Sequence, residues 1–451
     1  MATVNRRKVI RTHEGAPAKR INDEMALRRS VLACMLWENT FYEDGVDIAE
    51  RIASLVKNVD VNKVYNLAIE ARNDMKLRHA PLLIAREMAR IDSHKKVVAN
   101  LLENIIQRPD ELTEFLAIYW KDGRQPLSAQ VKKGLAKAFV KFDEYQYAKY
   151  YRRGGAVKLR DVMFLCHPKP KDGVRGYTRL ARKEGKKPPT PGSELFKKIV
   201  DNTLEPPDTW EVNLSAGKDK KQTWERLIKE RKLGALATLR NLRNMEKANV
   251  DRKLIKQAIE QINPKKILPY RFIAAAKYGS DYEPLLEKKL FECVEGMKFR
   301  GETVILVDVS ASMDQALSLN SDMKRIDAAC GTAMILREIC EDVRIFTFSN
   351  DTVKVPLRRG FALRDAILNS QKMSGTYLGL AVKEINKLDY DTLVVFTDEQ
   401  SHDRVPDPKN QGWIINVASY KNGVGYGKWN HIDGFSEAVI KFLIEFQKNF
   451  S

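Results

Sequence analysis

The segment that decides the fold of this chain is Thr303-Val304-Ile305-Leu306-Val307-Asp308-Val309-Ser310-Ala311-Ser312-Met313. It opens with an apolar, β-branched run of the kind that builds a fully buried strand. The run ends in one carboxylate and two hydroxyls on alternate residues, Asp308, Ser310 and Ser312. Hard oxygen ligands suit a small divalent cation, and Mg²⁺ accepts such a set while keeping some of its waters. The segment therefore predicts a metal site at the end of a strand, with a position open to a partner's carboxylate.

Two later segments complete this set of ligands. Ser374-Gly375-Thr376 precedes a helical pattern, and the apolar run Thr392–Thr397 is followed by Asp398. Strands that alternate with helices predict a parallel sheet, whose ligands lie at the carboxyl ends of the strands. Thr376 and Asp398 are therefore expected beside the first three ligands. We expect Mg²⁺ as the divalent metal ion, with Mn²⁺ or Ca²⁺ as alternatives.

Asp308-x-Ser310-x-Ser312, together with Thr376 and Asp398, resembles the metal-ion-dependent adhesion site (MIDAS) of a von Willebrand factor A domain. Two other interpretations exist. The Asp and Ser side chains could form only a turn and a helix cap. The strand-borne Asp308 could instead be the nucleophile of a phosphatase of the haloacid dehalogenase type. That chemistry needs a second acid two residues on, where this chain has Ser310.

Charge is divided unevenly along the 451 residues, a length that accommodates two or three domains. Residues 301–451 carry 17 Lys and Arg against 20 Asp and Glu, whereas residues 1–300 carry 61 against 39. The whole excess of +19 therefore belongs to residues 1–300. Such a field favours a polyanionic partner, either nucleic acid or an anionic membrane surface. We interpret residues 1–300 as the basic binding domain and residues 301–451 as the domain with the metal site.

Membrane insertion and secretion are not expected. No apolar run approaches the roughly 20 residues that a spanning helix needs, and Met1–Gly15 is basic and polar, without a signal-peptide core. The five cysteines include no Cys-x-x-Cys pair, so neither a disulfide framework nor a zinc site is indicated. We expect the reducing cytoplasm as the location.

The basic part reads as one amphipathic helix after another, separated by short polar breaks such as Asn58–Asn62. Helix pairs repeated in this way predict a HEAT-like α-solenoid with units of roughly 40 residues. A single irregular helical domain is the alternative. The predicted fold class is thus a helical repeat domain followed by an α/β domain with a doubly wound, Rossmann-like parallel sheet.

Positive charge is densest in residues 151–200, which carry 14 Lys and Arg against 4 Asp and Glu. They directly follow the tyrosine-rich stretch Tyr145–Tyr150. Cations contact phosphates, and tyrosines stack on unpaired bases, so this mixture favours single-stranded RNA or DNA over a membrane. Against this, Tyr147 and Tyr151 are four residues apart, as helix-packing partners are, and Arg179–Lys187 could be a solvated loop. We expect at least one of the two tyrosines to be buried.

Three further segments resemble the TROVE module shared by telomerase, Ro and vault proteins: Lys158–Pro170, Pro207–Glu211 and Leu236–Met245. The resemblance extends from about residue 20 to residue 290. A TROVE module followed by an A domain resembles the Ro autoantigen family, and the compact chain fits a bacterial or phage member. This resemblance implies that the helical repeats close into a ring. It also implies that misfolded non-coding RNAs thread a single-stranded 3′ end through the ring and that Y RNAs bind its outer basic surface.

The resemblance also implies particular RNA-binding residues. Lys149, Arg153 and His167 fall on family positions tied to Y RNA, and Arg152 adjoins them. A structural role is the alternative for His167, since a His at a helix end can cap carbonyl groups.

A second candidate RNA surface lies in the TROVE-like segment Leu236–Met245. Arg240, Arg243 and Asn244 are spaced to share one helix face, opposite Leu236, Leu239 and Leu242. That polar face could line the ring, or it could be an ordinary solvated face.

The sequence shows no nucleophile elbow, phosphate loop or His-rich catalytic cluster. We therefore expect a non-enzymatic, monomeric RNA-binding protein that acts in RNA quality control and tethers an exoribonuclease partner through RNA. The alternative is a metal-dependent protein-interaction scaffold whose A domain captures an acidic partner.

Overall fold

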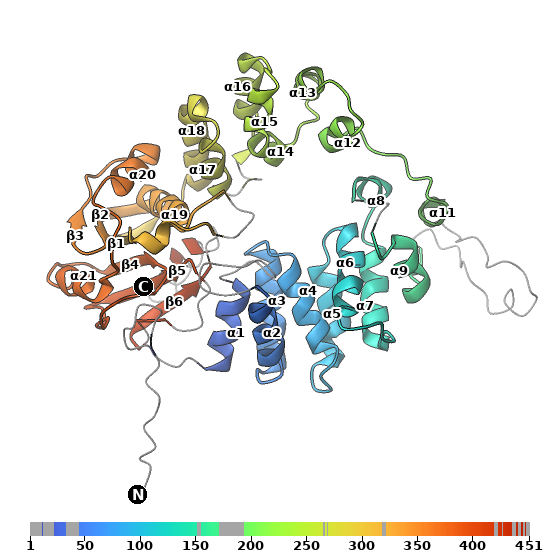
Figure 1. Ribbon diagram of the computed structural model, residues 1–451, viewed down its shortest axis with the longest axis horizontal. Helices are drawn as coiled ribbons and strands as arrows, with labels where there is room; N and C mark the ends of the chain where they lie inside the picture. The colour runs from blue at the N-terminus through green and yellow to red at the C-terminus, as the bar shows by residue number, and fades with distance from the viewer. Residues whose placement is uncertain are drawn as a thin grey trace, which may run out of the picture. The chain divides into compact units, whose positions relative to one another are not determined.

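The computed structural model describes residues 11, 22–32, 45–150, 155–170, 194–264, 267, 269–317, 322–418, 423–425, 427–434, 439–440, 443–444 and 447. The chain divides into two compact units (Figure 1). One unit is Ile52–Lys218, and the other combines Met1–Arg51 with Asp219–Ser451.

The unit Ile52–Lys218 is helical throughout its described part. After α2 (Gly45–Val56), which enters this unit, its helices are α3 (Val61–Asn73), α4 (His79–Met88), η1 (Lys95–Val97), α5 (Val98–Ile105), α6 (Pro109–Tyr119), α7 (Ala129–Phe139), α8 (Glu144–Tyr150), α9 (Leu159–Cys166), α11 (Glu194–Asp201) and α12 (Trp210–Ser215). Helices α3, α5, α7 and α9 contact one another in succession, and α4 contacts α6. This alternation is the packing of stacked helix pairs, so the predicted helical repeat region is confirmed.

The tightest of these contacts joins α5 to α7. A Cβ atom added at Gly134 would lie 2.9 Å from the carbonyl oxygen of Ala99 and 2.9 Å from the Cβ atom of Leu102. A side chain at position 134 would therefore push the helices apart. Val131 and Leu135 of α7 are fully buried on either side of this glycine, as the apolar spacing of the sequence requires.

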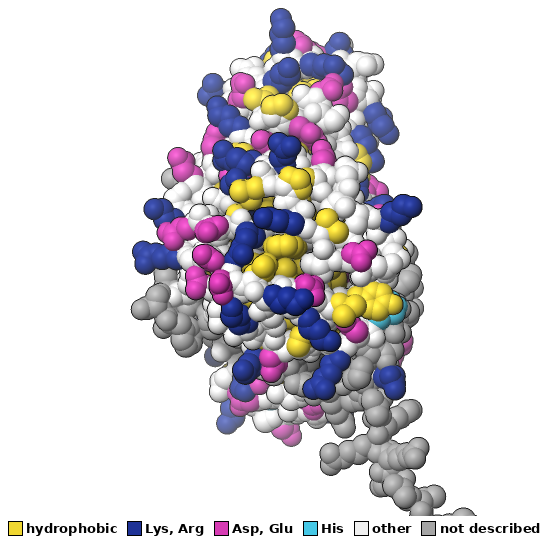
Figure 2. Space-filling view, turned by 90° about the vertical axis from the view of Figure 1, so that its left-hand side faces the viewer, with side chains coloured by type: hydrophobic (Ala, Val, Ile, Leu, Met, Phe, Trp, Pro, Cys, Tyr) yellow, Lys and Arg dark blue, Asp and Glu magenta, His cyan; other side chains and the backbone are white. Residues whose placement is uncertain are grey.

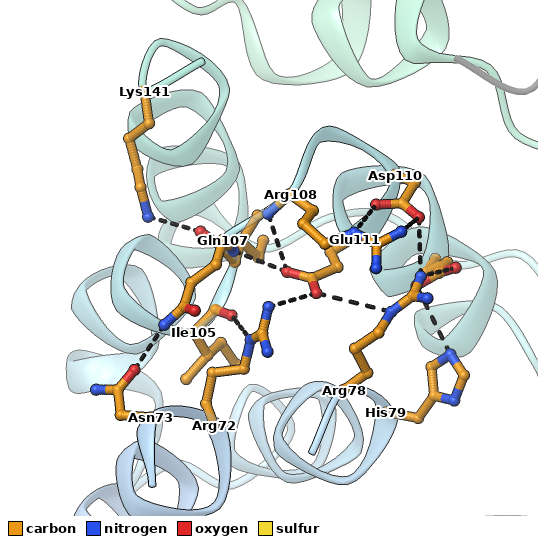
Figure 3. A network of polar contacts seen from close by, with 12 residues as sticks. Arg72, Asn73, Arg78, His79, Ile105, Gln107, Arg108, Asp110, Glu111 and Lys141 are labelled. Carbon is orange, nitrogen blue, oxygen red and sulfur yellow. Dashed lines mark hydrogen bonds and ion pairs between the residues drawn. The ribbon is translucent and has the colours of Figure 1, made fainter. Parts of the chain in front are cut away.

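A buried polar network joins α3, α4 and α6 (Figure 3). The Glu111 carboxylate is fully buried and accepts hydrogen bonds from Arg72 at 2.6 Å and from the backbone N–H of Gln107 at 2.7 Å. Arg72 also donates to the carbonyl oxygen of Ile105 at 2.9 Å, and Arg78 pairs with Asp110 at 2.9 Å. A buried carboxylate needs such partners. Some of the positive charge in this unit, such as that of the buried Arg72, is therefore structural.

The second unit joins helices to a sheet. Its elements are α1 (Asp23–Leu32), α13 (Lys220–Lys229), α14 (Ala235–Arg240), α15 (Leu242–Lys247), α16 (Arg252–Glu260), α17 (Tyr270–Ala276), η3 (Ser280–Tyr282), α18 (Glu283–Val294), β1 (Phe299–Asp308), η4 (Ala311–Asp314), α19 (Arg325–Ile339), β2 (Cys340–Phe348), β3 (Thr352–Lys354), α20 (Gly360–Leu368), α21 (Leu378–Ile385), β4 (Thr392–Thr397), β5 (Gln411–Asn416) and β6 (Trp429–Asp433).

The sheet has the order β3-β2-β1-β4-β5-β6, and every neighbouring pair is parallel except β2 with β3. Strand order reverses direction between β1 and β4, which is the switch point where ligands of doubly wound sheets lie. Strand β4 and the part of β1 from Thr303 to Asp308 are buried on both faces, as their continuous apolar runs require. The α/β fold predicted from Thr303–Met313 is confirmed.

Helices before the sheet domain also belong to this compact unit. Helix α18 contacts α19 and α20, and α17 contacts α19. A Cβ atom added at Gly331 of α19 would lie 2.8 Å from the Cδ1 atom of Ile273 in α17. Ile273 is buried against α19, so removal of α17 and α18 would expose apolar surface on the sheet domain.

Helix α1 packs against β6, a strand from a distant part of the sequence. Arg29 is 2% exposed, and its guanidinium donates to Glu399 at 2.7 Å and to Asp433 at 3.0 Å. Buried arginine requires such partners because desolvation of an unpaired charge is costly. No helix in the described part of the chain is both long and apolar enough to span a membrane.

Candidate functional site

The candidate metal centre lies where β1 and β4 end side by side. The parallel register pairs Val307 with Phe396, so Asp308 and Thr397 are the next residues along the two strands. The Thr397 hydroxyl donates to Asp308 Oδ2 at 2.6 Å. Asp308 is fully buried, and Asp398 is 1% exposed. The sheet therefore brings two carboxylates that are 90 positions apart in the sequence to one edge.

The turn after β1 adds two hydroxyl groups. The backbone N–H of Ser310 donates to Asp308 Oδ1 at 2.9 Å, which aligns the turn against the carboxylate. The hydroxyl oxygens of Ser310 and Ser312 are 3.2 Å apart. Oxygen atoms this close can bind the same small cation.

Backbone hydrogen bonds join the Thr376 loop to the turn after β1 and to the loop after β4. The backbone N–H of Ala311 donates to the carbonyl oxygen of Ser374 at 2.9 Å. The N–H of His402 donates to the carbonyl oxygen of Thr376 at 2.8 Å. Thr376 itself is 3% exposed. The three predicted ligand loops thus meet at one edge of the sheet. The role of Thr376 as a metal ligand stays a prediction.

Arg325 also enters this centre, which sequence reasoning missed. It is the first residue of α19, and it is 2% exposed. Its Nη1 atom donates to Asp398 Oδ2 at 3.2 Å and to the carbonyl oxygen of Ser312 at 3.3 Å. The sequence could have indicated this contact only if Arg325 had been recognised as a buried residue at the start of a helix. Burial is predicted from apolar residues, and an arginine is not one.

The electrostatics of the centre follow from this burial. Burial, reinforced by the negative charge of Asp398, raises the pKa of Asp308 above its ordinary range. Hydrogen bonds from Ser310 and Thr397 act in the opposite direction. Among the described residues no group of three or more His, Cys, Asp or Glu could hold a metal ion. A metal here would therefore depend on hydroxyl oxygens as well as on the two carboxylates.

A second buried charge cluster begins at the residue after Asp398. Burial alone would raise the pKa of Glu399, but the charges of Arg29 and His431 outweigh it and lower that pKa. His431 is 3.0 Å from Glu399 through Nδ1 and 2.7 Å from the carbonyl oxygen of Gly425 through Nε2. Glu399, Arg29 and His431 could not be recognised as a cluster from the sequence, because residues so far apart carry no common motif.

The candidate RNA-binding residues of α8 and its surroundings are only partly described. Lys149 is exposed, and its Nζ atom lies 5.6 Å from the ring centre of Tyr150. The guanidinium of Arg108 lies 4.2 Å from the same ring centre, so two cations lie near one tyrosine. Arg152 and Arg153 lie outside the described residues.

Tyr147 is a core residue, as expected for at least one of the two tyrosines. It is fully buried, packs its ring 5.2 Å from that of Phe139, and donates its hydroxyl to the Phe139 carbonyl oxygen. Burial raises the pKa of Tyr147 well above its ordinary value. Tyr151, the other tyrosine of this prediction, lies outside the described residues.

His167 terminates α9 with its backbone while its side chain remains exposed. Its φ of 50° is left-handed, and its N–H donates to the carbonyl oxygen of Met163 at 2.9 Å. This is the geometry of a helix C-terminus. The backbone of His167 therefore has the structural role that was the alternative. Its imidazole is exposed, and the RNA-binding role of this side chain stays a prediction.

The segment with Arg240 and Arg243 differs from the expected single helix. Helix α14 ends at Arg240 and α15 starts at Leu242, because Asn241 leaves the helical conformation and its side chain donates to the carbonyl oxygen of Ala237 at 2.9 Å. The expected apolar face was also wrong in part, since Leu236 is 42% exposed.

The two arginines of this segment are both exposed. The guanidinium of Arg243 lies 4.9 Å from the ring centre of Tyr278 and 3.9 Å from Asp322. Arg243 is thus partly engaged within its own unit, and its contact with RNA, like that of Arg240, stays a prediction.

Figure 2 shows the side of the molecule that carries β3, α20 and α21 at the left of Figure 1. Lysine and arginine side chains there are interspersed with aspartate and glutamate, around hydrophobic side chains near the middle. This mixture agrees with the near balance of charge in residues 301–451. The visible face offers a nucleic acid no field of a single sign.

Comparisons with known proteins agree with this architecture. The TROVE domain family matches residues 202–347, and the Ro60 vWA domain family matches residues 302–410. The crystal structure of the Deinococcus radiodurans Ro (RSR) protein is similar, with a TM-score of 0.59 and 18% sequence identity, over 95% of this chain and 100% of that one. No curated protein matches.

The fold and the two matched domains define an RNA-binding protein of the TROVE class that carries a von Willebrand factor A domain. Residues 202–410 thus match the TROVE and Ro60 vWA domain families, and the fold is similar to that of the Deinococcus radiodurans Ro protein. Of the three segments that carried the TROVE resemblance, Pro207–Glu211 and Leu236–Met245 lie in the matched range, and Lys158–Pro170 precedes it.

Proposed function

We propose that this protein binds Y RNA and the single-stranded 3′ ends of misfolded non-coding RNAs, and that it acts in RNA quality control. The observation that carries the proposal is the pairing of a TROVE domain with a Ro-type A domain in one chain. The net charge of residues 1–300, with 61 Lys and Arg against 39 Asp and Glu, supports a polyanionic partner. The ring expected for this family would supply the passage for a single strand.

Lys149, Arg153 and their neighbour Arg152 are the proposed phosphate contacts of the outer surface, and His167 adds a polar group nearby in sequence. Two cations lie near the Tyr150 ring, so this tyrosine is in a basic environment that also suits an unpaired base. Arg240 and Arg243 are the proposed contacts of a separate surface. The protein would bind and tether RNA without catalysis, as a cytoplasmic monomer, and would present the RNA to an exoribonuclease.

We also propose a divalent cation, Mg²⁺ in the cell, at the A domain. Asp308, Ser310, Ser312, Thr376 and Asp398 would hold it, since buried carboxylate and hydroxyl oxygens are the ligands that Mg²⁺ prefers. The cation would supply an open coordination position for a carboxylate of a partner. The 3.2 Å separation of the two serine hydroxyls and the burial of both carboxylates support this assignment.

Salt dependence tests the proposed RNA surface. Each phosphate contact adds to the slope of log affinity against log salt concentration, by roughly 0.7 for a single strand. The double substitution Lys149→Ala and Arg153→Ala should therefore weaken binding of a single-stranded RNA and flatten this slope by about 1 to 1.5. Fluorescence anisotropy at several salt concentrations measures both quantities.

The matched control removes two exposed cations from the A domain, with Lys383→Ala and Lys387→Ala in and after α21. This control should keep the wild-type affinity and slope. Unchanged affinity and slope in the Lys149 and Arg153 double variant would place the RNA site elsewhere.

A protein-interaction scaffold is the second candidate function. Met373 and Leu380 are 36% and 49% exposed on either side of the Thr376 loop, which favours a partner with apolar side chains beside an acidic one. Nucleic acid that copurifies with the protein, seen as a raised ratio of absorbance at 260 and 280 nm, would favour the RNA-binding function. Nucleic-acid-free protein that fails to bind added RNA would favour the scaffold.

A further inference from the structure

The candidate metal centre contains a cation of its own. Arg325 is 2% exposed and pairs with Asp398, which is 1% exposed, at an N to O distance of 3.2 Å. The same Nη1 atom donates to the carbonyl oxygen of Ser312 at 3.3 Å. One guanidinium therefore contacts two of the three loops that supply the proposed metal ligands.

The position of Arg325 is electrostatically unusual for a cation. As the first residue of α19 it lies at the positive end of the helix dipole, where a positive side chain is disfavoured. The neighbouring Lys324 lies in the same field, but its ammonium group pairs with Asp314 at 2.7 Å and its side chain is 43% exposed. Arg325 is buried instead, so the negative charge of the centre offsets the unfavourable dipole.

The charges of the centre explain this placement. Asp308 and Asp398 are two buried carboxylates close enough for the charge of Asp398 to act on Asp308. Without a counter-cation, two such groups repel each other in a medium of low dielectric. Arg325 neutralises one of them in the absence of any metal. A divalent ion must then bind beside an existing positive charge and share Asp398 with it.

We propose that Arg325 is a built-in competitor of the metal: it stabilises the metal-free A domain and weakens divalent cation binding, which requires the guanidinium to leave Asp398. This inference rests on the proposed metal site. The centre would consequently fill only at high free cation concentration, or when a partner's carboxylate adds a further negative ligand. Arg325 thereby sets the metal affinity without being a metal ligand.

A direct binding measurement with Mn²⁺ tests this role. The signal of free aqueous Mn²⁺ in electron paramagnetic resonance is lost on binding, so titration of the full chain gives the dissociation constant without an activity assay. Arg325→Gln should bind Mn²⁺ at least about tenfold more tightly than wild type, because removal of a buried like charge within a few ångströms changes affinity by that order.

Two control variants separate the possible explanations. Lys324→Gln removes the adjacent exposed cation and should leave the Mn²⁺ affinity within about twofold of wild type, because solvent screens its charge. Asp308→Asn should abolish binding in either background. Equal affinities of wild type and Arg325→Gln, with binding lost in Asp308→Asn, would leave the metal site standing and refute the role of Arg325.

Absence of Mn²⁺ binding in both wild type and Arg325→Gln at millimolar concentrations would refute the metal site and this inference together, while the RNA-binding proposal would stand on its own measurement. Thermal melting supplies a second readout. In chelator, Arg325→Gln should melt below wild type, and Mn²⁺ should raise its melting temperature more than that of wild type.

If Arg325→Gln is unfolded in chelator, its refolding at Mn²⁺ concentrations that leave wild type metal-free would support the proposal. Failure to refold at any Mn²⁺ concentration would contradict it.

Discussion

At the scale of single residues, the chemistry of this protein depends on which buried groups carry charge. His431 is the clearest case. Its two ring nitrogens face two acceptors, the Glu399 carboxylate at 3.0 Å and the carbonyl oxygen of Gly425 at 2.7 Å. Only the doubly protonated imidazolium can donate to both. Burial and the charge of Arg29 oppose this form, but Glu399 outweighs them and raises the pKa of His431.

This raised pKa predicts a pH dependence of stability. A group whose pKa is higher in the folded state stabilises the fold fully below its unfolded pKa, about 6.5 for histidine, and loses this contribution as pH rises through the folded pKa. The difference in unfolding free energy between wild type and His431→Gln should therefore be largest at acidic pH near 6 and shrink at alkaline pH. Denaturant unfolding of both proteins across this range measures it.

The other charged groups that face His431 are Glu399 and Arg29, and Asp433 pairs with the same arginine. Arg29 keeps its charge over this whole range. A constant difference between wild type and His431→Gln at every pH would show that the folded protein holds the imidazole neutral.

At the scale of elements, helix α1 is attached to the sheet by charge as well as by apolar packing. Arg29 reaches two carboxylates from the loop after β4 and from β6, and Leu27 and Val31 are fully buried beside it on the same helix. A Cβ atom added at Gly434 would lie 2.5 Å from the carbonyl oxygen of Leu32, so the end of the helix lies directly on the backbone. Helix α1 is thus part of the same compact unit as the sheet.

The substitution Arg29→Met should destabilise this unit strongly. It leaves Glu399 buried without its guanidinium partner, and breaking a buried ion pair on one side costs about 3 to 5 kcal/mol. Chemical unfolding monitored by circular dichroism measures the loss. Arg252→Met is the matched control, because the side chain of Arg252 is 63% exposed in its pairs with Asp281 and Glu246, and its loss should change stability by less than about 1 kcal/mol. Similar small losses in both variants would show that α1 is held by apolar contacts alone.

At the scale of the whole molecule, the division of charge predicts a division of labour. Residues 301–451 carry 17 Lys and Arg against 20 Asp and Glu, so they lack the field that attracts RNA. A fragment of residues 301–451 should therefore show no binding in the anisotropy assay under conditions where the full chain binds RNA. Tight binding by this fragment would overturn the assignment of RNA binding to the helical part.

The structure predicts that the fragment of residues 301–451 is less stable than a longer one. Helices α17 and α18 contact α19 and α20, and Ile273 lies against Gly331 of α19, so the fragment of residues 301–451 exposes surface that these helices cover in the full chain. A fragment of residues 219–451 keeps this cover and should melt at a higher temperature. Both fragments lack α1, which makes the comparison between them a matched one.

The sequence by itself determined the elements of the A domain and predicted which loops meet at the end of its central strands. Asp308, Ser310, Ser312, Thr376 and Asp398 follow from local patterns, because a buried strand must be apolar and parallel strands end at one edge. The helical repeats followed from apolar periodicity for the same reason. Each of these features depends on residues near one another in the chain, so a local sequence pattern predicts it.

Only the tertiary structure decided which charges meet. Arg325 and Asp398, or Arg29 and Glu399, are brought together from distant segments, and each arginine looks in the sequence like an ordinary exposed cation. The break at Asn241 was likewise hidden, because a side-chain hydrogen bond to Ala237 competes with the helix there. Pairing energies between distant buried charges depend on distance and desolvation, and both are properties of the folded chain that no local pattern encodes.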